Sequence, residues 1–332
     1  MIFSASSRKK PLSRPFTILC YLAVLPLLLA GCSAVQEEPE VYLFSFFQNN
    51  GEDGLHLIWS EDGYNWSPIN NNQSLLMPEV GNDQLMRDPC VIQGGDGRFH
   101  MVWTVSWDEK GIGYASSPDL INWSAQQYIP VMEHEPEATN CWAPEIFYDE
   151  ASEQYLIYWS TTIPGRFPET DSSGRNGRNH RMYCTTTKDF ENFSETRLLY
   201  DQGFNVIDGT IQKIDGEYVM FLKDETLNPE AEKNIRIARS SQFDRGYSPA
   251  SAPITGDYWA EGPTAIKHPD GWIVYFDRYQ EGRMGAVRST DLQNWTDITE
   301  EVSFPEDTRH GTVLKVKQSV LDQLKKAEQP GT

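Results

Sequence analysis

Positive charge is scarce in this sequence. Its 332 residues include 28 Lys and Arg against 48 Asp and Glu, for a formal net charge of −20. An acidic surface of this kind repels phosphate backbones, which argues against general nucleic-acid binding. The sequence also lacks a recognisable phosphate-binding loop, nucleotide fingerprint or Ser-His-Asp arrangement. These absences exclude several large classes of enzyme and leave other chemistry to be found.

Cysteine is sparse as well, with five residues in the whole chain. Cys20 and Cys32 lie near the N-terminus, which leaves Cys90, Cys141 and Cys184 for the rest of the chain. An odd number without short paired spacing argues against both a disulfide framework and a zinc site. We therefore predict that these three residues are buried free thiols.

The N-terminal segment contains the longest hydrophobic run, Phe16–Ala30, which follows a basic stretch. The run is short for a transmembrane helix and is interrupted by Pro26. It ends in Leu-Ala-Gly-Cys at residues 29–32, which resembles a bacterial lipobox. We therefore predict a lipoprotein signal peptide over residues 1–31 and lipidation of Cys32, with an ordinary secretory signal as the alternative.

The residues that follow Cys32 are mostly polar and acidic, so we interpret residues 32–40 as a tether between the lipid and the folded domain. A lipid anchor places the protein in the cell envelope, on a membrane face that the sequence does not identify. We expect a monomer with a lipid anchor and no nucleic-acid partner.

Aromatic residues are abundant, with 10 Trp, 15 Tyr and 15 Phe, and they take part in an internal repeat. The repeat reads Ser or Thr, any residue, Asp, three residues, then Trp or Phe. In such a turn the Asp side chain accepts hydrogen bonds from nearby backbone N–H groups, and the aromatic ring covers the hairpin. Clear copies occupy residues 60–66, 117–123, 187–193 and 289–295, and a degenerate copy occupies residues 240–247.

Each copy follows short runs rich in β-branched and aromatic residues, such as 99–104, 155–160 and 218–223, which are typical of strands. Several strands in a unit of about 50 residues are the signature of a β-propeller blade. The sequence therefore predicts an all-β fold, a five-bladed β-propeller over residues 41–317, rather than a sandwich. Within it the strand at 311–317 should help to close the ring. Residues 318–332 form a C-terminal tail, in which 318–328 are either one short polar helix or frayed.

Three acidic residues occupy similar places in this repeat, at the entry to the inner strand of a blade. They are Asp88, Asp208 and Glu261. A propeller gathers the beginnings of its inner strands around a central channel, so residues far apart in sequence converge there. Taken singly, each acid is equally typical of a turn or of a solvated loop.

The motifs around these acids resemble glycoside hydrolase family 43, in order and with one motif per blade. They are Asp88-Pro, Trp142-Ala-Pro-Glu, Asp208-Gly, Glu261-Gly-Pro and Arg309-His-Gly-Thr. The resemblance implies that Asp88 is the general base, that Glu261 is the general acid, and that Asp208 raises the pKa of Glu261 and orients it. It also implies inversion of configuration, for which the carboxyl groups of base and acid stand about 6.5–9.5 Å apart.

The resemblance further suggests residues that hold the sugar. Aromatic faces stack on sugars, so Trp107, Trp142 and Trp259 are candidate platforms, although blade core is the commoner role of a propeller Trp. In the resembled family the position of Glu145 has a supporting role. Residues 223–225 and Arg278 end inner strands, so they are candidates for the pocket and Arg278 for substrate binding, with ion pairs between blades as the equal alternative. A long polar loop over residues 162–180 is expected to overhang the pocket and to influence specificity.

His310 resembles a channel histidine that lies near a calcium ion in some family members. It is a candidate for substrate binding and for metal binding, and a calcium ion would reach the imidazole through water. A channel histidine without a metal is the equal alternative. No cofactor is expected to be required.

The sequence thus predicts an inverting, exo-acting glycosidase whose partner is a carbohydrate substrate. The first choice of substrate is a terminal α-L-arabinofuranoside of plant polysaccharides or oligosaccharides. A β-xylosidase, an exo-galactanase, a retaining glycosidase of another five-bladed family and a non-catalytic glycan-binding lipoprotein are the alternatives.

Overall fold

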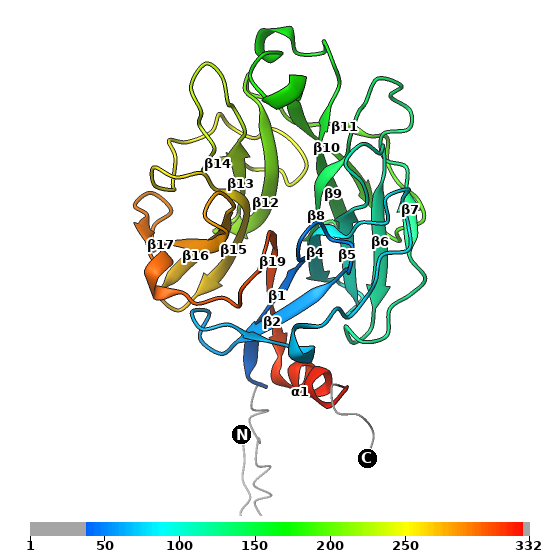
Figure 1. Cartoon of the computed structure of the whole chain (residues 1–332), viewed down its shortest axis with the longest axis vertical. Helices are drawn as coiled ribbons and strands as arrows, with labels where there is room; N and C mark the ends of the chain where they lie inside the picture. Colours follow the sequence, from blue (N-terminus) through cyan, green and yellow to red (C-terminus); the bar gives the residue numbers. More distant parts are fainter. Residues whose placement is uncertain (1–37, 328–332) are drawn as a thin grey trace, which may run out of the picture. The chain divides into compact units, whose positions relative to one another are not determined.

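The computed structural model describes residues 38–327, and these residues form five small antiparallel sheets around a central axis (Figure 1). Four sheets have four strands and one has three. The predicted five-bladed β-propeller is thus confirmed. The predicted signal peptide, Cys32 and most of the tether lie outside the described residues, so their assignments stay predictions.

The strand order within each blade runs from the central axis outward. In four blades the strands follow the order of the chain. The first of these contains β4 (Arg87–Gln93), β5 (Phe99–Thr104), β6 (Ile112–Ser117) and β7 (Gln127–Ile129), and the second contains β8 (Trp142–Asp149), β9 (Gln154–Thr162), β10 (His180–Thr187) and β11 (Arg197–Tyr200). The third contains β12 (Val206–Ile214), β13 (Glu217–Asp224) and β14 (Asn234–Ser240), and the fourth contains β15 (Glu261–His268), β16 (Gly271–Arg278), β17 (Arg283–Ser289) and β18 (Thr296–Asp297). The short 3₁₀ turns are η1 (Asn70–Asn72), η2 (Pro168–Thr170), η3 (Arg175–Gly177) and η4 (Thr299–Glu301).

The fifth blade joins the two ends of the described chain. Its strands are β19 (Gly311–Lys317), β1 (Glu40–Phe46), β2 (His56–Ser60) and β3 (Ser67–Pro68), in that order. β19 pairs antiparallel with β1 from Gly311 opposite Phe46 to Lys317 opposite Glu40. A late strand therefore closes the ring, as predicted, and leaves no open edge between the first and last blades.

The chain after β19 forms helix α1 (Gln318–Ala327), so most of the predicted tail is a helix. Its apolar side chains Leu321 and Leu324 are buried against the blade core that contains Val41 and Val316. Among residues 38–327 no helix has the length and hydrophobicity needed to span a membrane.

The inner strands of four blades share a β-bulge at their beginning. The pairing register with the next strand shifts between Arg87 and Cys90, and equivalent shifts occur at the start of β8, β12 and β15. The residue in the bulge has a positive φ in each case: 52° at Asp88, 45° at Ala143, 50° at Asp208 and 58° at Gly262. Bulges at strand ends turn side chains toward a site, and here they surround the channel.

The repeated turns have the contacts predicted from their sequence. In the turn after β6, Asp119 Oδ1 accepts hydrogen bonds from the backbone N–H groups of Ile121 and Asn122 at 3.0 and 2.7 Å. The side-chain amide of Asn122 donates to Asp119 Oδ2 at 2.8 Å, and the Ser117 hydroxyl donates to Oδ1 at 3.2 Å. Asp62, Asp189 and Asp291 repeat this pattern in three other blades.

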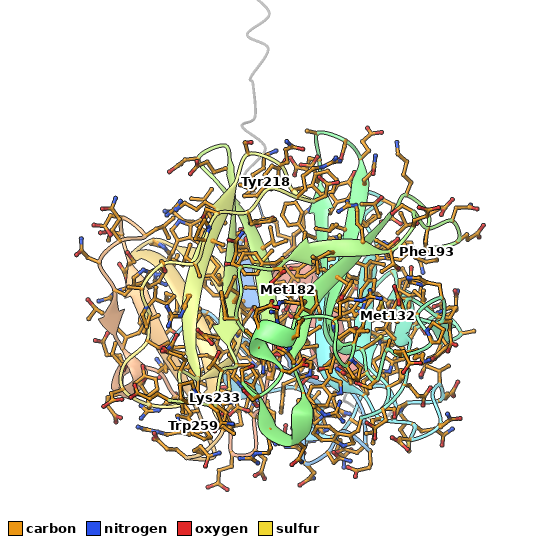
Figure 2. The ribbon with its side chains drawn as sticks, turned by 90° about the horizontal axis from the view of Figure 1, so that it is seen from above. Met132, Met182, Phe193, Tyr218, Lys233 and Trp259 are labelled. Carbon is orange, nitrogen blue, oxygen red and sulfur yellow. The ribbon has the colours of Figure 1, made fainter. Side chains whose placement is uncertain are left out.

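The hydrophobic core fills the spaces between neighbouring blades, as Figure 2 shows from above. Trp159 of β9 is fully buried in the cluster that joins the β4 and β8 blades. The three predicted free thiols are confirmed, because Cys90, Cys141 and Cys184 are buried and unpaired. Such packing makes the propeller a rigid support for the inner strand ends.

Candidate active site

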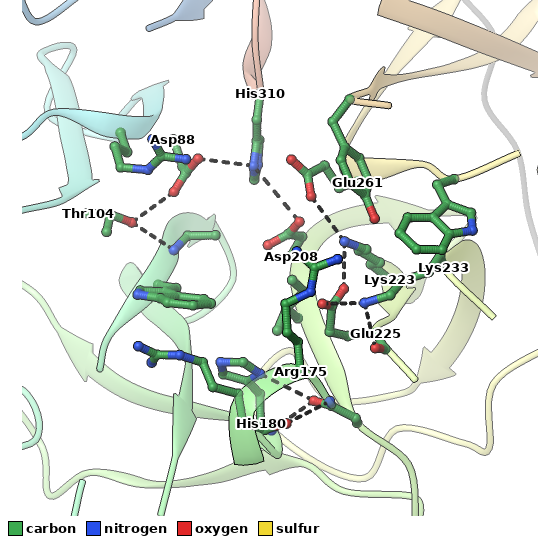
Figure 3. Close-up of a pocket in the computed structure, with 18 of the residues that line it drawn as sticks. Asp88, Thr104, Arg175, His180, Asp208, Lys223, Glu225, Lys233, Glu261 and His310 are labelled. Atoms are coloured by element: carbon green, nitrogen blue, oxygen red, sulfur yellow. Dashed lines mark hydrogen bonds and ion pairs between the residues drawn. The ribbon is translucent and has the colours of Figure 1, made fainter. Parts of the chain in front are cut away.

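A cavity of about 550 Å³ opens where the inner strands begin, and all three predicted acids line it (Figure 3). Asp88 comes from β4, Asp208 from β12 and Glu261 from β15. His310, the residue before β19, lies among them in the close-up. Four of the five blades thus contribute one of these side chains, which agrees with the convergence that the repeat predicted.

The three acids do not occupy equivalent backbone positions. Asp88 and Asp208 are the bulged residues of their strands, whereas Glu261 precedes the bulged residue Gly262. A Cβ atom at Gly262 would lie 2.3 Å from His310 Cγ, so only glycine fits beside the imidazole. Glu261 therefore stands one residue before the bulge, the position that Arg87 occupies in β4. Its longer side chain still reaches the cavity from there.

Asp88 is held by a hydroxyl on one side and a cation on the other. The Thr104 hydroxyl donates to its Oδ2 at 3.0 Å, and the same hydroxyl accepts the backbone N–H of Ala143 at 2.8 Å. His310 Nδ1 lies 3.3 Å from Oδ1. Burial alone raises the pKa of Asp88, but the positive charge and hydrogen bond of His310, with help from Arg87 and Thr104, lower it to about 2.

Asp208 has a different balance of charges. Its Oδ2 accepts the backbone N–H of Gly262 at 3.0 Å and lies 4.0 Å from His310 Nδ1. Burial is the largest effect and raises the pKa of Asp208 to about 6; the charges of His310 and Lys223 oppose this rise, while Glu261 and Asp88 add to it. Two aspartates in one cavity therefore differ in charge at mildly acidic pH.

His310 links these two aspartates and is buried between them. Burial lowers the pKa of its imidazole, but the carboxylates of Asp88 and Asp208 prevail and raise it to about 9. The ring is therefore a cation at neutral pH, and its charge holds Asp88 ionised.

Glu261 lies among side chains of both charges. Lys223 Nζ donates to its Oε2 at 3.0 Å, and Arg309 lies 3.8 Å from Oε1. Lys223 is fully buried and also contacts Glu225 at 2.6 Å. Glu225 in turn pairs with Lys233, which lies beside Trp259 in Figure 2 at 5.7 Å from its ring centre.

This side of the cavity was only partly visible in the sequence. Lys223 and Glu225 end or follow a strand that pairs with β12, so their place near the cavity could be suspected from the repeat. Lys233 and Thr104 carry no motif, and only the folded chain brings them to the cavity.

Asp277 is a further buried acid, and it lies opposite Glu261 in the sheet. Burial raises the pKa of Asp277 to about 6, although Arg309 donates a hydrogen bond to it at 2.8 Å.

Glu145 lies within the protein rather than in the cavity lining. Thr312 donates to its Oε1 at 3.1 Å and Tyr158 to its Oε2 at 3.3 Å. Burial raises the pKa of Glu145 to about 7. Its buried position keeps it out of the cavity, and its supporting role stays a prediction.

The predicted tryptophan platforms all line the cavity, but cations lie over them. The Arg87 guanidinium stacks 4.3 Å from the Trp107 ring centre, and the Arg178 guanidinium stacks 4.3 Å from that of Trp142. Trp142 also donates its indole N–H to the Trp107 carbonyl at 3.0 Å. Part of the aromatic surface expected to contact sugar is thus covered by arginine.

The structure does not bring Arg278 into this cavity. Its guanidinium stacks 3.8 Å from the Tyr258 ring centre and pairs with Glu281. Side chains alternate along a strand, and the neighbouring Asp277 faces Arg309. The loop over residues 162–180 does reach the cavity, as expected, through Arg175, Asn176, Arg178 and His180.

The residues around His310 do not fit a calcium ion that is bound directly. The imidazolium already lies 3.3 Å from Asp88 and 4.0 Å from Asp208, and it would repel a second cation at the same place. Within residues 38–327 no three His, Cys, Asp or Glu side chains converge as metal ligands would. A calcium ion that reaches His310 through water stays a prediction, and no step below uses it.

Acidic side chains with contrasting charge states, gathered at the channel mouth of a five-bladed propeller, are the arrangement expected of a glycan-cleaving enzyme. The comparison with known proteins identifies the family. Residues 37–322 match the family described as a probable glycosyl hydrolase domain, related to glycoside hydrolase family 43, and the chain belongs to it.

A curated relative is the α-L-arabinofuranosidase of Bifidobacterium longum subsp. longum, which is 24% identical over 265 residues. The alignment covers 66% of this chain and 25% of the relative, so the chain spans about a quarter of that protein's length. Among solved structures, the α-L-arabinanase of Cellvibrio cellulosa, in complex with arabinohexaose, has a TM-score of 0.55 at 13% identity and covers 83% of this chain and 96% of its own. A GH43_1 enzyme of Xanthomonas citri in complex with xylotriose has a TM-score of 0.51 at 13% identity, over 66% and 74% of the two chains. These likenesses establish the same fold.

Proposed function

We propose that this glycoside hydrolase is an inverting, exo-acting enzyme that removes terminal α-L-arabinofuranose from plant polysaccharides or oligosaccharides. The observation that carries the proposal is the meeting of Asp88, Asp208 and Glu261 around one cavity with His310 between the two aspartates. The choice of sugar is supported by the arabinofuranosidase among its relatives. A β-xyloside or a terminal β-galactoside are the other candidate substrates.

Asp88 is the proposed general base. With a pKa of about 2 it is ionised at every pH at which the enzyme is expected to work. Thr104 fixes Oδ2 and His310 fixes Oδ1, so the carboxylate is oriented before substrate binds. It would take a proton from a water molecule, which then attacks the anomeric carbon from the face opposite the leaving group.

Glu261 is the proposed general acid. It would donate its proton to the glycosidic oxygen as the bond to the anomeric carbon breaks, and it would become a carboxylate. Lys223, 3.0 Å from Oε2, is placed to stabilise the negative charge that develops. Asp208, held by the Gly262 N–H, would orient the sugar and the acid.

The lipid anchor at Cys32, the location in the cell envelope and the monomeric state are part of this proposal and are supported by the sequence alone. Metabolic labelling with a radioactive fatty acid, in cells that produce the protein or its Cys32→Ser variant, would test the anchor. Sedimentation of the purified protein would test the monomer.

The activity is tested with the 4-nitrophenyl glycosides of α-L-arabinofuranose, β-D-xylose and β-D-galactose, together with an arabinose-substituted oligosaccharide. Asp88→Asn should abolish release of sugar from all of them. Glu261→Gln should harm the natural oligosaccharide far more than the arabinoside, because nitrophenolate leaves without protonation. NMR of the first sugar released should show the inverted anomer.

Release from one glycoside identifies the sugar. Retention of configuration would contradict the inverting mechanism and favour a nucleophilic carboxylate. Binding of oligosaccharides without any hydrolysis, unchanged in Asp88→Asn, would overturn the enzyme and favour a glycan-binding protein.

A further inference from the structure

We propose that the cavity selects saccharides with an anionic group, the carboxylate of a uronic acid or a sulfate ester, next to the sugar that is removed. The group would bind to a cationic wall made of Arg87, Arg175 and Arg178. This inference rests on the proposed function, because it names the class of substrate that the same cavity accepts.

The cations that line the cavity differ in how far protein carboxylates compensate their charge. On one side, the lysines Lys223 and Lys233 are each paired with a carboxylate, Glu225 serving both and Glu261 serving Lys223. Both ammonium groups on that side therefore already have acceptors in the protein. The arginines of the cationic wall have much less compensation: Arg87 and Arg178 lie over Trp107 and Trp142, whereas Arg175 is drawn toward Asp208 and Lys223 in Figure 3.

Arg87 is oriented by neutral groups. It donates to Asn50 Oδ1 at 3.0 Å and lies over the rings of Phe47 and Trp107, at 4.6 and 4.3 Å from their centres. No carboxylate lies within ion-pair distance of Arg87 among the residues that the structure describes. Its stacked position leaves guanidinium N–H groups that have no protein acceptor.

Arg178 has one partner, and that partner is on the surface. It donates to Asp108 at 2.7 Å, but the Asp108 side chain is 76% exposed, and water weakens such a pair. Its other terminal nitrogen, Nη1, is buried and makes no hydrogen bond within the described part of the chain. Arg178 is therefore only weakly compensated by the protein, and its side chain lines the cavity over Trp142.

Arg175 lies in η3, at the tip of the long loop, and its side chain is exposed at the cavity (Figure 3). Its guanidinium has no hydrogen bond or ion pair with any side chain between residues 38 and 327. The loop beneath it is nevertheless fixed, because the Ser173 carbonyl accepts the backbone N–H groups of Leu227 and Asn228 at 2.7 and 3.0 Å. A free cation on an anchored loop can contact a ligand without first ordering the chain.

The rest of the molecule makes this local concentration of cations informative. A protein with a net charge of −20 repels anionic saccharides in general, so only a local cluster of cations can attract them. The guanidinium group presents parallel N–H donors that match the paired oxygens of a carboxylate or a sulfate. The arginines also cover part of Trp107 and Trp142, so this wall provides charge where a neutral sugar would need a bare ring.

The experiment measures binding by calorimetry in the Asp88→Asn background, so that no turnover is needed. The probes are xylotriose substituted with glucuronate, its carboxyl-reduced form, and galactotriose with and without a sulfate ester. We expect an anionic probe to bind about tenfold more tightly than its neutral partner at low salt, and this advantage should shrink as salt is added. The probe that shows the advantage identifies carboxylate or sulfate as the source of charge.

Removing the wall should remove the advantage. The pair of substitutions Arg175→Gln and Arg178→Gln should bring each anionic probe close to its neutral partner, whereas Arg239→Gln, which removes one charge from β14 outside the cavity lining, should not. Equal binding of charged and neutral probes, or an advantage that survives the double substitution, would overturn the inference. Hydrolysis of a neutral arabinoside tests the proposed function separately, so either idea can fail alone.

Discussion

Two sets of aspartates in this chain use the same side chain in opposite ways. The turn aspartates, Asp62, Asp119, Asp189 and Asp291, accept backbone and side-chain N–H groups within their own turns. Partial burial opposes ionisation of Asp62, but the N–H groups of Asn65 and Tyr64 lower its pKa to about 2. Asp208 in the cavity lacks such a ring of donors, and burial raises its pKa to about 6.

The difference shows that the repeat keeps the residues that form each turn and varies the residue at the bulge of the inner strand. The turn aspartates recur with the same neighbours in four blades, because each blade needs the same turn. At the bulge of the inner strand the residue changes from blade to blade: Asp88, Ala143, Asp208 and Gly262. The backbone conformation is common to all four; Asp88 and Asp208 reach the cavity from this position, and Glu261 reaches it from the residue before Gly262.

The largest expected effect separates the two sets by activity. Asp88→Asn should lower turnover of an arabinose-substituted oligosaccharide by about 10³-fold or more, because a general base typically contributes 10²- to 10⁴-fold. Asp119→Asn should leave turnover near the wild-type value, since its contacts lie within one surface turn. Steady-state kinetics of the two variants measure this contrast; equal losses would show that the turns also control the site.

The next effect separates them by stability. Asp119→Ala removes the acceptor of several N–H groups and should cost about 1–2 kcal/mol of unfolding free energy, similar to the loss of a helix N-cap. Asp208→Asn should cost little at neutral pH, because it removes a buried charge and leaves an oxygen for the Gly262 N–H. Urea unfolding of both variants is the measurement, and a larger loss in Asp208→Asn would refute the assignment.

The pH dependence of stability should differ in sign between the sets. The folded state raises the pKa of Asp208 from 3.8 to about 6, so it holds more protons than the unfolded state in that window and its contribution to stability falls as pH rises. Asp62, lowered to about 2, contributes stability that is present above pH 3.8 and is lost as pH falls toward 2.

Thermal unfolding from pH 2 to 7 of Asp208→Asn and Asp62→Asn tests these signs. Relative to wild type, the melting temperature of Asp208→Asn should rise between pH 4 and 7. That of Asp62→Asn should fall between pH 2 and 4 and then stay constant. Parallel curves for the two variants would mean that the cavity does not oppose ionisation of Asp208.

How much could be predicted from the sequence depended on whether a residue belongs to a repeated motif. The five blades, the closing strand and the positions of Asp88, Asp208 and Glu261 follow from local patterns that recur along the chain. Arg278 was placed at the end of an inner strand, but the alternation of side chains in β16 directs it toward Tyr258 and away from the cavity.

Other features of the site depend on contacts, within and between blades, that leave no local pattern. Thr104 connects Asp88 of its own blade to the Ala143 N–H of the next, and Lys233 reaches Glu225 from the other end of the loop between β13 and β14. The stacking of Arg87 on Trp107 likewise joins residues 20 positions apart whose approach requires the folded blade. Such pairs could not be distinguished from ordinary surface residues before the structure was known.

The smallest expected effect concerns a hydroxyl in each set. Thr104→Val removes the donor to Asp88 Oδ2 and should lower kcat about fivefold with little change in KM, since one net hydrogen bond of about 1 kcal/mol is lost where the base is oriented. Thr104→Ser keeps the hydroxyl and should restore most of the rate. Ser117→Ala removes the equivalent donor to Asp119 and should lower stability while kcat is unchanged.

Because Thr104 also accepts the Ala143 N–H, both variants at this position are compared at a temperature well below unfolding. If Thr104→Val loses only stability, then Asp88 is oriented by His310 alone and Thr104 serves the fold, as the turn residues do.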